Sequence, residues 1–357
     1  MTRQRILVLT ASIGAGHDGP AKELARRLQF RGAHVMLVDL VDVAPFGQSL
    51  RRAFRGVLTR NPRRWGRICA SFEKSPRLPV AARVLIALAG RRVAQVIDED
   101  SIDLVVSTYL FGGRVMGAAR EYLDRPVPVV TYVTDPAVHP LWIDDVTDLY
   151  LATWTFTMPL LRGLTATPAA LVAPATREPF NSRLGDVRTG WQPSGDKPWA
   201  LVVSGPWGVG DVVGAARDVL ADGRFRPVVG CGNNAGLLAE VDAIPGVIAL
   251  GWVRDMAALM RDYSVAVLNS GGLTLAEAAS IGLPVVHHKP LPGQGEMNAA
   301  ACRAGAGAPV SNDVLQLRAA LDAALDNAAS LTTRLGDVDP AAAILLGLGR
   351  DAVAEGR

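Results

Sequence analysis

Short apolar strands alternate with helices along this chain in two series, and that alternation limits the fold more than any other feature. The first series opens with a strand at residues 6–9, a helix at 20–31 and a strand at 33–39, and the second opens with a strand at 199–203. Between them, residues 183–198 are polar and rich in Gly, Pro and Asp. Such alternation builds parallel, doubly wound sheets. We therefore expect an α/β protein in which two Rossmann-like halves, joined by a linker, face each other across a cleft.

One stretch of the second series, residues 269–298, predicts a ligand site. Gly271 and Gly272 lead into a helix that carries Glu277, and a strand and a polar loop follow. Backbone amides exposed by glycine at a helix N-terminus suit a phosphate. A carboxylate one turn inside the helix suits a ribose diol, and a polar loop suits sugar hydroxyls. The stretch thus favours a nucleotide-sugar site over the alternative, an ordinary strand-to-helix turn with a polar loop.

The same stretch resembles the donor-binding region of a family of glycosyltransferases with two facing Rossmann-like domains, the GT-B fold. This family includes the monogalactosyl- and glucosyl-diacylglycerol synthases and the relatives that glycosylate lipid II. Its pattern is Gly-Gly-x-Thr-x-x-Glu-Ala, then Gly-x-Pro, then Pro-Gly-Gln-Glu-x-x-Asn. Gly295 stands where the family has its second Glu, and Glu296 follows it, which leaves the donor hexose open. The residues that fit the pattern are Gly271, Gly272, Thr274, Glu277, Ala278, Gly282, Pro284, Pro292, Gly293, Gln294 and Asn298.

A histidine at the first strand-to-helix turn is the candidate base. Residues 12–17 read Ser-Ile-Gly-Ala-Gly-His, which is neither a dinucleotide fingerprint nor a P-loop. The turn resembles the Gly-Gly-Gly-His loop of the diacylglycerol glycosyltransferases, and the resemblance implies that His17 is the general base, with Gly14 and Gly16 near the acceptor. An imidazole with a pKa of ~6.5 suits removal of a hydroxyl proton. The alternative is a histidine that only caps the helix.

A second motif places an acid beside this histidine. Residues 131–142 read Thr-Tyr-Val-Thr-Asp-Pro-Ala-Val-His-Pro-Leu-Trp and resemble the Val-Thr-Asp … His-Pro-x-Trp signature of the monogalactosyldiacylglycerol synthases. Asp135 ends a strand, so we expect it to point into the cleft and either to orient His17 or to be the base itself. The resemblance implies that His139 and Trp142 bind the acceptor. The alternative for Asp135 is a turn residue before Pro136.

Two further loops resemble donor-binding elements of the family. Residues 203–210 follow a strand as the family's diphosphate-facing glycine loop does, and residues 251–256 resemble the turn that frames the uracil. Arg177 resembles the arginine near the end of the family's first domain. The residues expected to bind the donor are Gly205, Gly208, Gly210, Trp252, Val253, Ser270, Gly271, Gly272, Thr274, Glu277, Gln294, Glu296 and Asn298.

Positive charge is concentrated in residues 51–92, which hold twelve Lys or Arg and one acid, Glu73. Bulky apolar residues are interleaved with the cations, a mixture that suits helices lying on an anionic bilayer. The alternative is an insertion that packs on its own domain while its arginines are solvated. The residues expected at the membrane are Arg51, Arg52, Arg55, Arg63, Arg64 and Trp65.

Composition sets further limits. The chain has no run of 18 apolar residues and no signal-like leader, and its three cysteines have neither a metal-binding nor a paired spacing. We therefore expect a cytoplasmic protein associated peripherally with the inner face of the membrane. The Asp-x-Asp strings, at 98–100 and 337–339, lie away from the motifs, so we expect no required metal and no cofactor besides the UDP-sugar co-substrate.

Together these features predict an inverting glycosyltransferase that moves a hexose from a UDP-sugar to a hydroxyl of a lipid such as diacylglycerol. The expected partners are the UDP-sugar, the lipid acceptor and an anionic membrane, and not nucleic acid. Three rivals stay open: a transferase acting on a soluble natural product or polysaccharide precursor, a sugar-nucleotide epimerase, and a non-catalytic sugar-nucleotide-binding subunit. The expected domains are an acceptor domain at 1–187, a linker at 188–198, a donor domain at 199–338 and, from the resemblance, a terminal helix at 339–357 that crosses back to the first domain.

Overall fold

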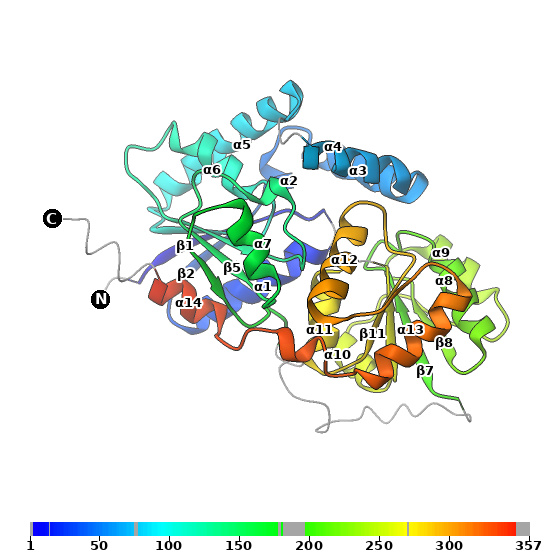
Figure 1. The fold of residues 1–357 in the computed structure, drawn as a ribbon. Coiled ribbons are helices and arrows are strands. Elements are labelled where there is room, and N and C mark those ends of the chain that lie inside the picture. The colour runs from blue at the N-terminus through cyan, green and yellow to red at the C-terminus, as the bar shows by residue number, and fades with distance from the viewer. Residues whose placement is uncertain are drawn as a thin grey trace.

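The computed structural model describes residues 3–13, 15–74, 78–177, 180, 197–269 and 271–347. These residues form two α/β halves, shown in blue to green and in green to red in Figure 1. Each half has a parallel sheet covered by helices on both faces, which is the arrangement that the alternating sequence predicted. The predicted fold class is confirmed.

Six described strands form the first sheet in the order β2-β1-β3-β4-β5-β6, and every neighbouring pair is parallel. Alternate side chains of β1 enter different layers: Ile6 and Val8 pack in one cluster, and Leu7 and Leu9 in another. The strands are β1 (Arg5–Thr10), β2 (His34–Asp39), β3 (Leu104–Ser107), β4 (Val129–Val133), β5 (Leu149–Ala152) and β6 (Ala169–Leu171).

The helices of the first half include the basic stretch, which is three helices rather than one continuous segment. Figure 1 shows α3 and α4 reaching from the first half toward α12 of the second. The helices are α1 (Ala15–Phe30), α2 (Leu40–Val43), α3 (Gly47–Arg60), α4 (Pro62–Lys74), α5 (Val80–Glu99), α6 (Gly112–Arg120), α7 (Thr157–Leu164) and the 3-10 turn η1 (Pro140–Trp142).

Six described strands form the second sheet in the order β12-β11-β10-β7-β8-β9, again all parallel. Its strands are β7 (Trp199–Val203), β8 (Arg226–Gly230), β9 (Ile248–Leu250), β10 (Val265–Leu268), β11 (Val285–His288) and β12 (Val310–Ser311). Its helices are α8 (Val212–Asp222), α9 (Ala235–Asp242), α10 (Met256–Arg261), α11 (Leu273–Ser280), α12 (Gln294–Ala306), α13 (Val314–Asp326) and the 3-10 turn η3 (Thr332–Arg334).

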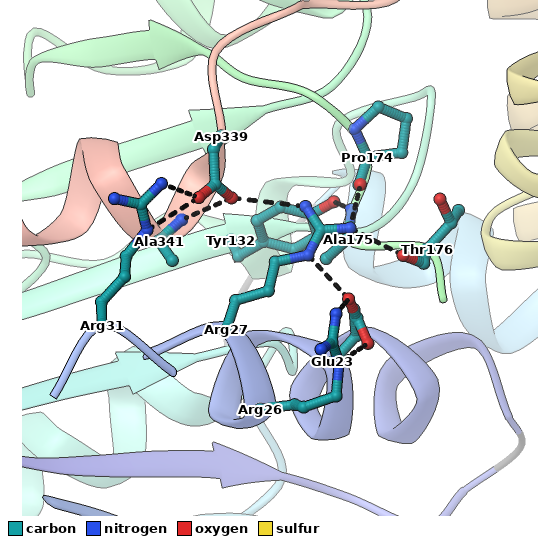
Figure 2. A network of polar contacts seen from close by, with 10 residues as sticks. All are labelled: Glu23, Arg26, Arg27, Arg31, Tyr132, Pro174, Ala175, Thr176, Asp339 and Ala341. Carbon is teal, nitrogen blue, oxygen red and sulfur yellow. Dashed lines mark hydrogen bonds and ion pairs between the residues drawn. The ribbon is translucent and has the colours of Figure 1, made fainter. Parts of the chain in front are cut away.

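After η3 the chain returns to the first half as α14 (Pro340–Gly347), whose Ile344 is buried with α1 and β1. A polar network fixes this return (Figure 2): Asp339 accepts from Arg31 at 2.6 Å and pairs with Arg27 at 3.3 Å. Arg27 is largely buried and also bonds Glu23 at 2.7 Å. Residues 348–357 of the expected terminal helix and 188–196 of the expected linker lie outside the described residues, so the domain boundaries stay predictions.

Candidate active site

Two cavities lie between the halves, where the carboxyl ends of both sets of strands meet. Cavity A has a volume of about 650 Å³ and is lined by α1 and by the β7, β9 and α11 regions of the second half. Cavity B, about 390 Å³, lies beneath α3 and α4. Gly205, Pro206, Leu273 and Thr274 line both, so the cavities adjoin at the N-terminus of α11. Ligands of doubly wound folds bind at this edge of the sheet.

Glu277 is a buried carboxyl group in the wall of cavity A. It lies on α11, is 6% exposed, and has a pKa raised to about 7 by burial and opposed by Arg177. Gly272, with φ of 110°, begins this helix. Trp252, which is 59% exposed, and Val253 form another part of the wall. A buried carboxyl group with a pKa of about 7 suits a ribose diol, and an exposed indole in the same cavity suits a nucleobase.

The glycines of the loop after β7 differ in position: one faces the cavities, and two shape the loop. Gly205 lines both cavities. Gly208 and Gly210 adopt positive φ, and a Cβ on either would lie 2.4 Å from Leu237 or Asn269. Neither lines cavity A or B, so in this structure they shape the loop, and their donor role stays a prediction.

His17 lines cavity B and is held in one tautomer. Its Nδ1 lies 2.9 Å from the Thr108 carbonyl oxygen and 3.1 Å from the Thr134 hydroxyl. A carbonyl only accepts, so Nδ1 carries the proton and the Nε2 lone pair is left to accept another. Burial lowers the pKa of His17, and the charge of Asp135 partly opposes that shift. The imidazole is consequently neutral and basic at neutral pH.

Asp135 follows β4 and is buried against the second half. Its Oδ1 accepts from Asn298 Nδ2 at 3.0 Å, and Asn298 Oδ1 in turn accepts from the Ala137 amide at 3.1 Å. Burial raises the pKa of Asp135, while His17 and the hydrogen bond from Asn298 act to lower it. The aspartate is thus placed to stabilise a protonated His17 and to connect the two halves.

The polar residues expected on a loop lie instead in the first turns of α12 and do not all face one cavity. Gln294 and Asn298 line cavity B, and Asn298 is almost fully buried in the contact with Asp135. Glu296 is exposed, lines neither A nor B, and accepts from the Gly293 amide at 3.0 Å, a contact that caps α12. Gly271 and Thr274 do line cavity B.

The two residues predicted to bind the acceptor, His139 and Trp142, differ in their access to cavity B. His139 lines cavity B, but its Nδ1 accepts from the Leu141 amide at 3.1 Å and its Nε2 lies 3.3 Å from the Cys69 carbonyl oxygen. Trp142 is buried, lines neither A nor B, and packs 5.8 Å from the His17 ring. Of the other predicted residues, Gly16 lines cavity B, while Gly14 and Ser270 lie outside the described residues.

The basic helices turn their apolar faces toward cavity B. Trp65 packs on Phe54 at 4.8 Å, and both line the cavity, so Trp65 is not free to enter a bilayer in this structure. Arg51 is half-buried and donates to Ser12 at 3.1 Å. Arg55 lies 5.8 Å over the Trp207 ring. The exposed predicted cations are thus Arg52, Arg55, Arg63 and Arg64.

Thr108 and Thr134 are functional residues that the sequence analysis missed. Both directly follow a strand, β3 and β4, and reach His17 from the carboxyl edge of the sheet. That position was visible in the sequence, because the residue after each buried parallel strand points to the cleft. In the described parts of the chain, no three His, Cys, Asp or Glu side chains gather as metal ligands.

The fold is that of the GT-B class, and similarity to curated enzymes shows the chain to be a glycosyltransferase. The chain is 25% identical over 312 residues to the processive diacylglycerol beta-glucosyltransferase of Bacillus subtilis (strain 168), which covers 84% of this chain and 81% of the relative. The enzyme of the same name from Bacillus cereus (strain ATCC 14579) is 26% identical over 309 residues, covering 83% and 79%. The resemblance that the motifs indicated is confirmed, although no family model matches the chain.

Solved structures agree on the fold. MurG of Acinetobacter baumannii superposes with a TM-score of 0.61 at 17% identity, covering 97% of this chain and 99% of that one. The glycosyltransferase SnogD from Streptomyces nogalater gives 0.62 at 18% identity, covering 98% and 99%. Across the described residues, no helix has both the length and the apolar character required to span a bilayer.

Proposed function

We propose that this enzyme transfers a hexose from a UDP-sugar to a hydroxyl group of a lipid, with diacylglycerol as the leading acceptor. One observation carries the proposal. A histidine whose Nδ1 is committed to the Thr108 carbonyl faces the apolar cavity B, and cavity B adjoins cavity A, where Glu277 is buried. A base, an apolar acceptor space and a nucleotide space thus meet at the N-terminus of α11.

In the proposal, cavity A binds the UDP half of the donor. Glu277 accepts from the ribose hydroxyls, and Trp252 and Val253 frame the uracil. The diphosphate lies at the N-terminus of α11, where Gly271 and Gly272 let the backbone approach closely. These amides and the helix dipole stabilise the departing diphosphate, so we expect turnover to continue in the presence of a chelator.

The proposed reaction is a single displacement. His17 Nε2 accepts the proton of the acceptor hydroxyl while the hydroxyl oxygen bonds to the anomeric carbon. The bond from that carbon to the diphosphate breaks on the opposite face, which gives a β-glycoside and UDP. Asp135 stabilises the imidazolium that forms, in the manner of an acid beside a general base.

A lipid acceptor is favoured over a soluble one by the lining of cavity B. Side chains of α3 and α4 (Phe54, Leu58, Trp65 and Phe72) give it an apolar wall next to His17. The relatives at 24–26% identity are named for a diacylglycerol acceptor and for β-glucosyl transfer, so glucose is the first hexose to test. We further propose that the exposed arginines of α3 and α4 bind the protein peripherally to an anionic membrane surface.

The test is product formation from defined substrates. Purified protein is incubated with UDP-glucose, UDP-galactose or UDP-N-acetylglucosamine and with dioleoylglycerol in phosphatidylglycerol vesicles, with and without EDTA, and products are analysed by mass spectrometry. We expect glycosyl-diacylglycerol and stoichiometric UDP. Donor hydrolysis without glycolipid, or transfer only to water-soluble acceptors, would refute the lipid assignment.

A further inference from the structure

A third cavity lies inside the first half, behind the catalytic histidine. Cavity C has a volume of about 200 Å³ and lies at the carboxyl ends of β1 and β3, roofed by α2, α3 and α5. Residues of α5 that line it include Ala82, Leu85, Ile86 and Ala89. The reaction described above assigns it no role.

Cavity C adjoins cavity B. Ile13, Tyr109 and Phe111 line both. The Tyr109 ring packs edge-on against His17, with centroids 5.1 Å apart, and against Phe111 at 5.7 Å. A ligand whose hydroxyl lies at His17 would reach cavity C along Tyr109 and Phe111, the side chains that the two cavities share.

The residues that line cavity C are apolar and suit a hydrocarbon chain. Tyr109 carries the one polar side-chain atom among the described residues that line it, and none of them is charged. A sugar or nucleotide there would leave its hydroxyl groups or charge without partners, at a cost of several kcal/mol. A methylene chain would instead gain by leaving water.

The apolar surface also reaches the outside of the molecule along α5. Val84 is 52% exposed and Leu88 is 43% exposed, and Leu88 lies one helical turn from Leu85 of the cavity wall. Helices α3 and α4, which carry exposed arginines, lie along the same side of the molecule as α5 (Figure 1). Apolar side chains flanked by cations are what a helix at an anionic bilayer presents.

We propose that cavity C binds the distal part of an acyl chain of the acceptor lipid whose hydroxyl group lies at His17. The inference rests on the proposed lipid acceptor and adds where its chain goes. It makes the enzyme sensitive to acyl length, because each methylene buried in the cavity is worth about fourfold in affinity.

The first test fills the cavity. Ala82→Trp places an indole in cavity C, and Ala87→Trp, on the exposed side of the same helix, is the matched control. We expect Ala82→Trp to raise KM for dipalmitoylglycerol more than tenfold, to change KM for dioctanoylglycerol less than threefold, and to leave UDP affinity intact. Equal effects on both acyl lengths, or equal effects of the two variants, would overturn the inference.

A second test needs no turnover. Diacylglycerol with a diazirine at the terminal carbon of one chain is photolysed with the unaltered protein, and the labelled peptides are mapped. Label within residues 82–89 or 40–50 supports cavity C even if no sugar is transferred, in which case the proposed function alone fails. Label confined to residues 54–72, or no label, overturns cavity C even if glycolipid is formed.

Discussion

His17 illustrates how a backbone carbonyl decides what a side chain can do. The Thr108 carbonyl accepts from Nδ1, which leaves Nε2 as the basic atom, and burial keeps the ring neutral by lowering its pKa. A histidine that merely capped α1 would instead accept from a backbone amide of that helix. The observed partner lies 91 residues further along the chain, which favours the predicted base over the predicted alternative.

We expect His17→Ala to reduce kcat by 10²–10⁴-fold, roughly 3–5 kcal/mol in barrier, because the proton is transferred only in the transition state. UDP affinity should be nearly unchanged, since Glu277 and the α11 N-terminus are intact. In the unaltered enzyme, the lowered pKa of His17 keeps the base unprotonated at mildly acidic pH. We therefore expect kcat/KM to decline only at pH values below ~6.5. The exposed His34→Ala is the control, and a kcat within a few-fold of the parent would assign the base to Asp135.

We expect Glu277 to lower the stability of the fold at high pH while it strengthens UDP binding. Its pKa rises from 4.5 to about 7 on folding, so its contribution to stability is present below pH 4.5 and is lost as pH rises through 7. Glu277→Gln should therefore raise the free energy of unfolding at pH 8 by up to about 3 kcal/mol, with little gain at pH 4.5. It should also weaken UDP binding by roughly 1–3 kcal/mol.

Urea unfolding at both pH values and calorimetry with UDP measure these two effects of Glu277→Gln. A variant that is destabilised at pH 8, or that binds UDP as the parent does, would contradict the role given to this carboxylate. The two readouts are independent, so a folding defect is not mistaken for a binding defect.

At the residue scale, the sequence predicted which side chains are candidates for the chemistry but not which residues contact them. His17, Asp135 and Glu277 were predicted from motifs, and the structure places them at the two adjoining cavities. The partners of Asp135 were not predicted, because Asn298 is 163 residues away and its amide suits either a sugar or a protein group. Only the closed arrangement of the two halves shows that it bonds the aspartate.

At the element scale, hydrophobic pattern found most strands and missed short ones. β1 was expected at 6–9 and spans Arg5–Thr10, whereas β5, β6 and β12 were not predicted. β6 has only three residues, too few for a period of two to be recognised. α1 begins at Ala15 rather than near residue 20. Pro20 lies inside the helix, past its first turn, where it removes one backbone hydrogen bond, so proline was a misleading start signal.

The helix pair α3 and α4 fits both interpretations of its sequence, an insertion packed on its own domain and helices lying on an anionic bilayer. Its apolar face packs inward on cavity B, as an insertion would, while Arg52, Arg63 and Arg64 are exposed, as a membrane-binding surface requires. Since Trp65 lines the cavity, we expect the proposed attraction to a bilayer to come from charge and from the exposed residues of α5.

Replacing Arg52, Arg63 and Arg64 with Gln should therefore release the protein from phosphatidylglycerol vesicles. Each cation contributes up to about 1 kcal/mol near an anionic surface, so the triple variant loses up to about 3 kcal/mol at low salt and less at high salt. Co-sedimentation measures the loss. Arg162, Arg303 and Arg318, exposed on other helices, replaced together with Gln, provide the charge-matched control.

Equal losses in the two triple variants would mean that net charge, rather than this surface, governs binding. No binding by the parent at low salt would remove the membrane proposal and make the soluble-acceptor transferase the leading rival. UDP affinity should be the same in the parent and both variants, because cavity A is not altered.

At the scale of the whole molecule, the active site exists only while the two halves are in contact. Asp135 meets Asn298 of α12, Gly19 of α1 admits Leu273 of α11, and Gly293 lies against Cys69 of α4. A Cβ on Gly19 would lie 2.4 Å from Leu273 Cδ2. The geometry of His17 toward the donor therefore depends on these small contacts between domains.

Asn298→Asp should open the cleft by placing a second carboxylate against Asp135. Above neutral pH both carboxylates are ionised and repel, whereas at pH 5.5 one of them holds a proton and donates to the other. We expect a larger radius of gyration in small-angle X-ray scattering at pH 8.5 than at pH 5.5, and a loss of turnover on the order of 100-fold from misplaced reactants. Asn312→Asp, on the exposed surface before α13, should change neither quantity. If Asn298→Asp kept the parent's radius at both pH values while losing turnover, Asn298 would act on the base alone and not on the closure of the domains.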